Sequence, residues 1–115
     1  MEDFVPFEIA KKLKEKGFDC SCIGHYVNNQ LYIAHYLNAF HSDKDESLDA
    51  PTISQVLKWL RSQEISVEPL STPYNDWKCY VKHKGEIVIM ISGDKYRTYE
   101  QAAIAGIEEV LDNLI

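Results

Sequence analysis

The sequence has no long apolar segment and few cysteines. Its longest unbroken apolar run covers residues 87–91, far fewer than the roughly 20 residues that a membrane-spanning helix needs. We therefore expect no membrane role. The three cysteines, Cys20, Cys22 and Cys79, are an odd number, and no apolar run of signal-peptide type precedes them. Together these features predict a cytoplasmic protein that keeps its thiols reduced.

Basic residues are also scarce. Twelve Lys and Arg residues stand against eighteen Asp and Glu residues, which gives a net charge of -6. This balance repels a phosphate backbone unless the bases gather on one face, so nucleic acid is disfavoured as a partner. At 115 residues and 45% hydrophobic content, the chain is large enough to form a core without disulfide or metal staples. We predict a single domain over residues 1–115.

Two helix-capping patterns are the clearest local signals. Thr52-Ile-Ser-Gln55 and Thr98-Tyr-Glu-Gln101 each precede an apolar run with helical spacing. In such a capping box the Thr hydroxyl accepts a hydrogen bond from the third helical amide, and the Gln side chain returns to the Thr amide. The two boxes predict helices over residues 52–63 and 98–114.

A further helix is predicted over residues 6–16, ending at Gly17, with Phe18 folding back on its last turn in a Schellman cap. Strands are predicted at residues 23–28, 31–37, 66–70, 77–83 and 86–91. Pro69 places one of them at a sheet edge, and Lys84-Gly85 forms the last hairpin turn. The acidic residues 41–49 are expected to form a mobile surface connection.

These elements predict an α+β fold in the order α-β-β-α-β-β-β-α. One antiparallel sheet of four or five strands is expected, with the second and third helices covering mainly one face.

The first hairpin carries three tyrosines that share one parity, Tyr26, Tyr32 and Tyr36, whereas His25 and His35 fall on the apolar parity. An aromatic face of this kind is typical of a base-stacking platform, of a contact with another protein, or of cross-strand packing inside one chain. Stacking on nucleic acid needs flanking cations, and few are present here. A protein contact is therefore the favoured interpretation, since tyrosine is enriched at interfaces.

The only basic concentration is formed by Lys78, Lys82 and Lys84, with Lys95 and Arg97 beyond the next strand. Lysines on a sheet edge discourage pairing with other chains, so edge protection explains them without a ligand. They are also the first candidates for any contact with nucleic acid.

No pattern predicts a metal site, a cofactor site or catalytic residues. Cys20-Ser-Cys22 with His25 and Cys79 contains zinc ligand types, but the Cys-x-Cys spacing is tighter than that of ordinary zinc loops. The alternating residues 43–49 resemble a calcium loop without its Gly and its final Glu. No thiol stands beside an imidazole in a local catalytic signature. A small enzyme or ligand binder built on Cys and His remains an alternative.

Residues 52–115 resemble a double-stranded RNA-binding domain in the order helix, three strands, helix. Tyr99-Glu-Gln-Ala102-Ala103 resembles the Ala-rich start of the last helix of that family. The family's lysine run at this helix is replaced here by Asp94-Lys-Tyr-Arg-Thr-Tyr-Glu100. The resemblance implies a shared topology. A nucleic-acid-associated protein is the alternative function that it implies.

Over nearly its full length the chain resembles a family of small uncharacterised proteins of gut-bacterial genomes and their mobile elements. The matching stretches are Val5-Pro-Phe-Glu8, Leu13-Lys-Glu-Lys-Gly-Phe-Asp19, Ala50-Pro-Thr52, Trp59-Leu-Arg61, Trp77 and Tyr99-Glu-x-Ala102. This resemblance implies a shared fold and a cytoplasmic setting, and it assigns no functional residues. The favoured function is a non-enzymatic interaction module that acts through protein contacts, as a homodimer that uses sheet edges or the tyrosine face.

Overall fold

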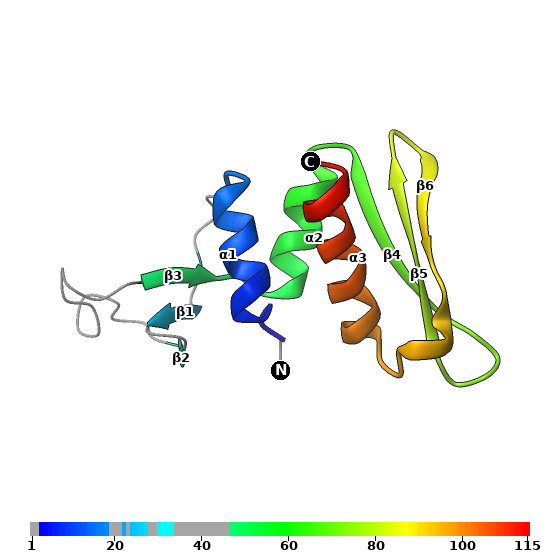
Figure 1. The fold of residues 1–115 in the computed structure, drawn as a ribbon, viewed down its shortest axis with the longest axis horizontal. Coiled ribbons are helices and arrows are strands. Elements are labelled where there is room, and N and C mark those ends of the chain that lie inside the picture. Colours follow the sequence, from blue (N-terminus) through cyan, green and yellow to red (C-terminus); the bar gives the residue numbers. More distant parts are fainter. Residues whose placement is uncertain (1–2, 19–21, 23, 28–29, 34–46) are drawn as a thin grey trace. The chain divides into compact units, whose positions relative to one another are not determined.

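The computed structural model describes residues 3–18, 22, 24–27, 30–33 and 47–115. Contacts divide the chain into two compact units, residues 1–52 and residues 53–115. The elements follow the order α-β-β-β-α-β-β-β-α, with a short 3₁₀ helix before the last helix (Figure 1). The division does not decide the domain count, so the single domain remains a prediction.

The first unit begins with helix α1, Phe7–Glu15. Its end confirms the predicted Schellman cap. Gly17 has a φ of 89°, its amide donates to the Lys14 carbonyl, and the Phe18 amide donates to the Leu13 carbonyl over 3.0 Å. Phe18 is buried. Glycine suits this position because a positive φ costs it little.

The sheet of the first unit contains three antiparallel strands in the order β2-β1-β3. They are β1, Gly24–Val27, β2, Gln30–Ile33, and β3, Ser47–Ala50. Strand β3 corrects the expectation for residues 41–49. Residues 47–49 pair with β1 instead of forming a surface connection, and residues 41–46 lie outside the described part. The acidic composition suggested a loop, but successive residues of a strand point to opposite faces. Asp49 is therefore exposed while Ala50 next to it is buried.

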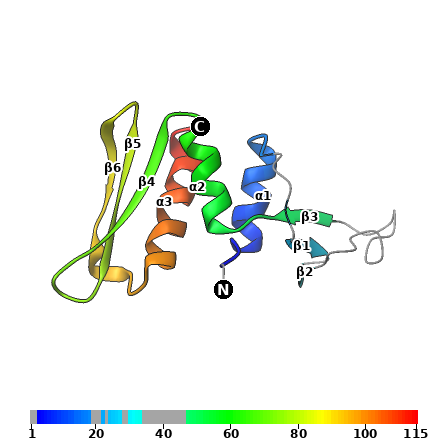
Figure 2. The ribbon, with the colours of Figure 1, turned by 180° about the vertical axis from the view of Figure 1, so that it is seen from behind.

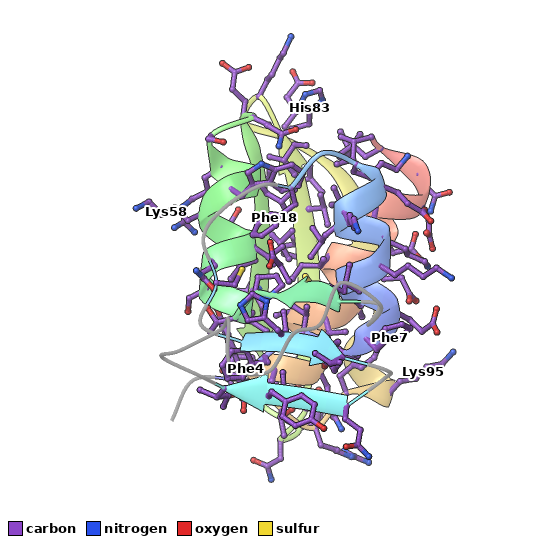
Figure 3. The ribbon with its side chains drawn as sticks, turned by 90° about the vertical axis from the view of Figure 1, so that its left-hand side faces the viewer. Phe4, Phe7, Phe18, Lys58, His83 and Lys95 are labelled. Atoms are coloured by element: carbon purple, nitrogen blue, oxygen red, sulfur yellow. The ribbon has the colours of Figure 1, made fainter. Side chains whose placement is uncertain are left out.

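Packing in the first unit joins the N-terminal segment to this sheet. Phe4 forms an isolated antiparallel bridge with Thr52, and the Val5 amide donates to the Pro51 carbonyl over 3.0 Å. Figure 3 shows Phe7 at the lower end of α1. The buried apolar residues of this unit are Val5, Ile9, Ala10, Leu13, Phe18, Cys22, Tyr26, Val27 and Ala50.

The second unit has helix α2, Ile53–Arg61, strands β4, Ile65–Ser71, β5, Trp77–His83, and β6, Glu86–Ile91, a 3₁₀ helix η2, Gly93–Lys95, and helix α3, Tyr99–Asn113. The order helix, three strands, helix confirms the order expected from residue 52 onward. The strands form an antiparallel sheet in the order β4-β5-β6, and α2 and α3 cover one of its faces (Figures 1 and 2).

The sequence patterns of this unit hold at most positions. The apolar residues with helical spacing that follow the first capping box are buried in α2, namely Ile53, Val56, Leu57 and Leu60. Strand β4 lies at an edge, as Pro69 predicted. Lys84 and Gly85 have φ values of 53° and 85°, as expected for a tight hairpin turn. The other buried apolar residues are Ile65, Val67, Cys79, Val81, Ala102, Ala103, Ile107, Val110 and Leu111.

The cap of α3 is a capping box with a shifted return bond. Thr98 Oγ1 accepts from the Gln101 amide over 3.1 Å, as predicted. Gln101 Oε1 accepts from the Arg97 amide over 2.8 Å instead of from the Thr98 amide. Next to this cap, the Trp77 and Tyr99 rings pack edge to face, with centroids 5.7 Å apart. The return bond expected at the start of α2 remains a prediction.

The α+β class is confirmed, and the single sheet of four or five strands is wrong. The described strands form two separate three-stranded antiparallel sheets. One sheet would need the two hairpins to join edge to edge. Strand β3 instead occupies one side of β1, and helix α2 follows β3 directly. Among the described residues, no helix is long and apolar enough to cross a membrane.

Candidate functional site: the open face and free edge of the second sheet

The register of the second sheet separates a covered face from an open face. Val67 lies opposite Val81, and Val81 lies opposite Ile89. Since paired residues share a face, and Val67 and Val81 are buried, this row lies on the face under α3. The adjacent row contains Glu68, Tyr80 and Met90. It lies on the open face.

Two of the predicted lysines belong to this open face, and both have a partner there. Lys78 Nζ lies 5.0 Å from the centroid of the Tyr80 ring. Lys82 Nζ lies 3.1 Å from Glu68 Oε2, and both side chains are partly exposed. Strand β5 is the central strand, so the prediction that these lysines protect a sheet edge is wrong. They sit in the middle of the sheet, with polar or aromatic neighbours.

Strand β6 forms one edge of the sheet and lacks the protection that was expected of an edge. Ile87, Val88 and Met90 are 50%, 48% and 71% exposed. A register shift leaves Val88 between two paired positions, since Val81 pairs with Ile89 and Lys82 pairs with Ile87. The residues from 87 to 91 carry no charge and no proline. The sequence already showed this apolar strand as its longest apolar run, which could have pointed to the site.

The opposite edge, β4, is different. It contains Pro69, which has no main-chain N–H, and the charged Glu68. Both features discourage pairing with another strand. The two edges of one sheet therefore differ, and β6 is the one open to a partner strand.

The predicted tyrosine face is wrong. Strands β1 and β2 are joined through a two-residue connection, so Val27 pairs with Gln30, His25 with Tyr32, and Tyr26 with Leu31. An odd-numbered residue therefore lies opposite an even-numbered one. Tyr26 and Tyr32 consequently lie on opposite faces of the hairpin. Tyr36 lies outside the described residues.

The two described tyrosines have different environments. Tyr26 is 9% exposed, its hydroxyl donates to the Val5 carbonyl over 2.7 Å, and its ring packs edge to face against Phe7. Burial raises the pKa of Tyr26. Tyr32 is 38% exposed, and its hydroxyl donates to Gln30 Oε1. Tyr26 thus belongs to the core, and Tyr32 to the surface.

The residues considered for metal binding and catalysis do not gather in the described part of the chain. His25 Nδ1 lies 3.2 Å from Asp49 Oδ1 across β1 and β3. Cys22 is buried in the first unit, and Cys79 is buried in the second. Burial raises the pKa of Cys79 to about 11. The described residues include no group of three or more His, Cys, Asp or Glu side chains placed to hold a metal ion; Cys20 lies outside them.

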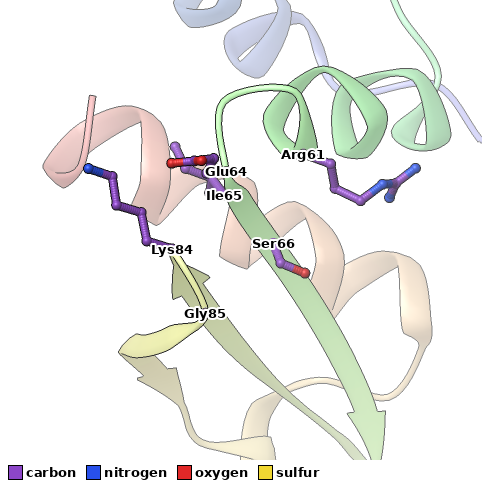
Figure 4. Close-up of a pocket in the computed structure, with 6 residues that line it drawn as sticks. All are labelled: Arg61, Glu64, Ile65, Ser66, Lys84 and Gly85. Atoms are coloured by element: carbon purple, nitrogen blue, oxygen red, sulfur yellow. The ribbon is translucent and has the colours of Figure 1, made fainter.

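A shallow hollow lies where α2 and the turn between β5 and β6 meet the start of β4. It has a volume of about 690 Å³ and is lined by Arg61, Glu64, Ile65, Ser66, Lys84 and Gly85. Figure 4 shows the Arg61 and Lys84 side chains extending in different directions. Arg61 is the last residue of α2, where the helix dipole is negative and does not favour an anion. The two cations therefore do not form a convergent anion site.

Comparison of the chain with protein-family models, with curated proteins and with solved structures gave no match. Both resemblances noted in the sequence therefore remain predictions.

Proposed function

We propose that this protein is a non-enzymatic interaction module that binds an extended segment of a partner protein along the free edge of β6. The observation that carries this proposal is the uncharged run from residue 87 to 91 at that edge, in which Ile87, Val88 and Met90 are exposed. An edge strand has main-chain N–H and C=O groups that its own sheet leaves unpaired. A strand from another protein can pair with them, which is a common mode of peptide recognition.

The side chains of β6 favour such a partner as well. Ile87, Val88 and Met90 each expose about half of their surface or more to water. Covering apolar surface contributes roughly 25 cal/mol per Å². Main-chain pairing would set the direction of the partner strand, and the apolar contacts would add affinity.

Strand β6 supports this role better than the edge strands β4 and β2. Strand β4 contains Pro69 and Glu68. Strand β2 also exposes Leu31, Tyr32 and Ile33, but the chain continues from it directly into residues 34–46, which lie outside the described part. The open edge is therefore assigned to β6.

The alternative functions receive less support from the same unit. Lys78 and Lys82, the best candidates for phosphate contacts, already interact with Tyr80 and Glu68. A thiol with a pKa of about 11, as at Cys79, stays protonated at neutral pH and is a poor nucleophile. An interaction through the β6 edge uses neither group.

A synthetic peptide with the sequence of residues 86–91, flanked by lysines for solubility, tests the proposal. We expect it to shift the backbone amide NMR signals of β6 in isotope-labelled protein as the peptide is added up to millimolar concentration, and to slow hydrogen exchange there. The double variant Val88→Lys, Met90→Lys should lose this response. Lysine is what many natural edge strands carry against pairing.

A matched control is Tyr74→Lys. Tyr74 is 81% exposed in the connection between β4 and β5, so this change adds a similar charge to an exposed apolar position away from β6. The control should bind the peptide as the wild type does. Absence of any shift at millimolar peptide, or shifts centred on α2 and α3, would overturn the proposed function.

A further inference from the structure

We infer that the strand which pairs with β6 is β6 of a second copy of this chain, in antiparallel orientation. Two copies would then form one continuous sheet in the order β4-β5-β6-β6-β5-β4. This inference rests on the proposed function, because it names the partner that occupies the same edge.

Charge is the first argument for a second copy. The residues of β6 from Ile87 to Ile91 are uncharged, and Glu86 at its start is the only charged residue of the strand. A strongly basic or acidic partner segment would find no matching charges there. An uncharged apolar strand does match, and β6 is itself such a strand.

The surroundings of β6 also permit two acidic chains to approach. With a net charge of -6, two copies repel one another at long range. On the open face next to β6, however, Lys82 pairs with Glu68, and Lys78 lies against Tyr80. The Lys82–Glu68 pair cancels and Lys78 is positive, so this part of the surface does not share the negative charge of the molecule as a whole, and repulsion is weaker here.

The antiparallel orientation follows from Glu86. A parallel pair in register would place the two Glu86 side chains next to one another, and like charges directly opposite are unfavourable in a sheet. An antiparallel pair related by a twofold axis places them at opposite ends of the paired segment. The apolar runs then face one another.

The two edges of the sheet explain why association would stop at two copies. Pairing through β6 consumes the unprotected edge of both copies. The outer edges of the joined sheet are then both β4, with Pro69 and Glu68, which discourage further strand addition. A twofold contact that uses the same strand from each copy closes on itself. The expected product is therefore a dimer and not a fibre.

The interface is expected to be small. Specific, stable interfaces bury about 1,200–2,000 Å² in total, and a pair of six-residue strands reaches this range only if neighbouring side chains of the open face contribute. We expect a dimer that dissociates on dilution, with a dissociation constant on the order of micromolar or weaker.

Two measurements on the full chain test the inference. Sedimentation velocity follows the mass over an about 100-fold dilution, from 500 to 5 µM, and hydrogen exchange is measured at both ends of this range. The wild type should pass from one chain mass to two, and β6 amides should lose protection on dilution while β4 amides keep theirs. The Val88→Lys, Met90→Lys variant should raise the dissociation constant at least tenfold. Tyr74→Lys should change it less than twofold, and circular dichroism should show that both variants are folded.

The outcomes separate this inference from the proposed function. A chain that stays monomeric at every concentration while β6 still binds the strand peptide overturns the dimer and leaves the proposed function standing. A dimer whose protected amides lie outside β6, with no peptide binding at β6, overturns both. Larger assemblies that grow with concentration would overturn the closed twofold arrangement.

Discussion

The Tyr26 hydroxyl donates a hydrogen bond of 2.7 Å to the Val5 carbonyl oxygen, across 21 residues of sequence. Val5 is fully buried, and Tyr26 is 9% exposed. The Val5 amide meanwhile donates to the Pro51 carbonyl. The carbonyl and the amide of Val5 thus both hold the segment before α1 in place, through Tyr26 of β1 and Pro51 after β3.

Replacing Tyr26 by Phe should destabilise the protein by about 1–2 kcal/mol, because it removes the donor and leaves a buried carbonyl without it. Urea unfolding followed by circular dichroism measures this loss. Tyr32→Phe is the control, since Tyr32 is 38% exposed and its hydroxyl bond is at the surface. Equal costs for the two variants would show that the Val5 bond contributes little.

Helix α3 lies close to the sheet at Gly106. A Cβ atom there would lie 2.6 Å from Val67 Cγ1 and 2.7 Å from Cys79 Sγ. We expect Gly106→Ala to destabilise the protein by about 1–3 kcal/mol through overpacking, although alanine favours a helix by about 1 kcal/mol over glycine. Thermal unfolding of the single and double variants with Cys79→Ala checks the cause. The Gly106→Ala cost should fall in the Cys79→Ala background, and an unchanged cost would contradict the contact with Sγ.

The cap of α3 can be tested at Thr98, whose Oγ1 accepts from the Gln101 amide over 3.1 Å. Thr98→Ala should cost about 1 kcal/mol, because it removes the acceptor for an unpaired helix amide. Thr98→Ser retains a hydroxyl, and serine is at least as favourable as threonine at an N-cap, so it should cause little or no loss of stability. Chemical denaturation distinguishes these values. If serine were as destabilising as alanine, the methyl group of Thr98 and not its hydroxyl would be the stabilising feature.

Sequence patterns predicted the local elements of the second unit well. The spacing of Val56, Leu57 and Leu60 marks one buried face of α2, and Lys84-Gly85 marks a tight turn through its positive φ values. These features depend on neighbours in the sequence. Periodicity and turn chemistry are therefore sufficient to identify them.

Pairing between distant strands was not predictable in the same way. Strand β3 has Asp49 among its four residues, so its composition suggested a loop. Only its partner, β1, makes it a strand. The separation into two sheets depends on that pairing, and so does the contact between His25 Nδ1 and Asp49 Oδ1.

Part of the candidate site could be predicted from the sequence. The lysines Lys78 and Lys82 were identified, but their place on a central strand requires the strand order β4-β5-β6. The same order places the apolar run from 87 to 91 at an edge of the sheet. The tyrosine face failed because a two-residue connection changes which parities lie opposite one another.

The buried thiol of Cys79 should make the protein less stable at alkaline pH. Burial raises the pKa of its thiol from 9.0 to about 11, so the folded state binds this proton more tightly than the unfolded state. Its contribution is complete below pH 9 and is lost as the pH rises through 9 toward 11. Between pH 8 and pH 10 the loss should be about 1 kcal/mol.

Urea unfolding of the wild type and Cys79→Ala at both pH values isolates the contribution of this thiol, because the other titrating groups, including Tyr26, are common to both proteins. The stability difference between the two proteins should shrink at pH 10 by this amount. A difference that stays constant or grows would mean that the thiol of Cys79 ionises in the folded protein as readily as in the unfolded chain.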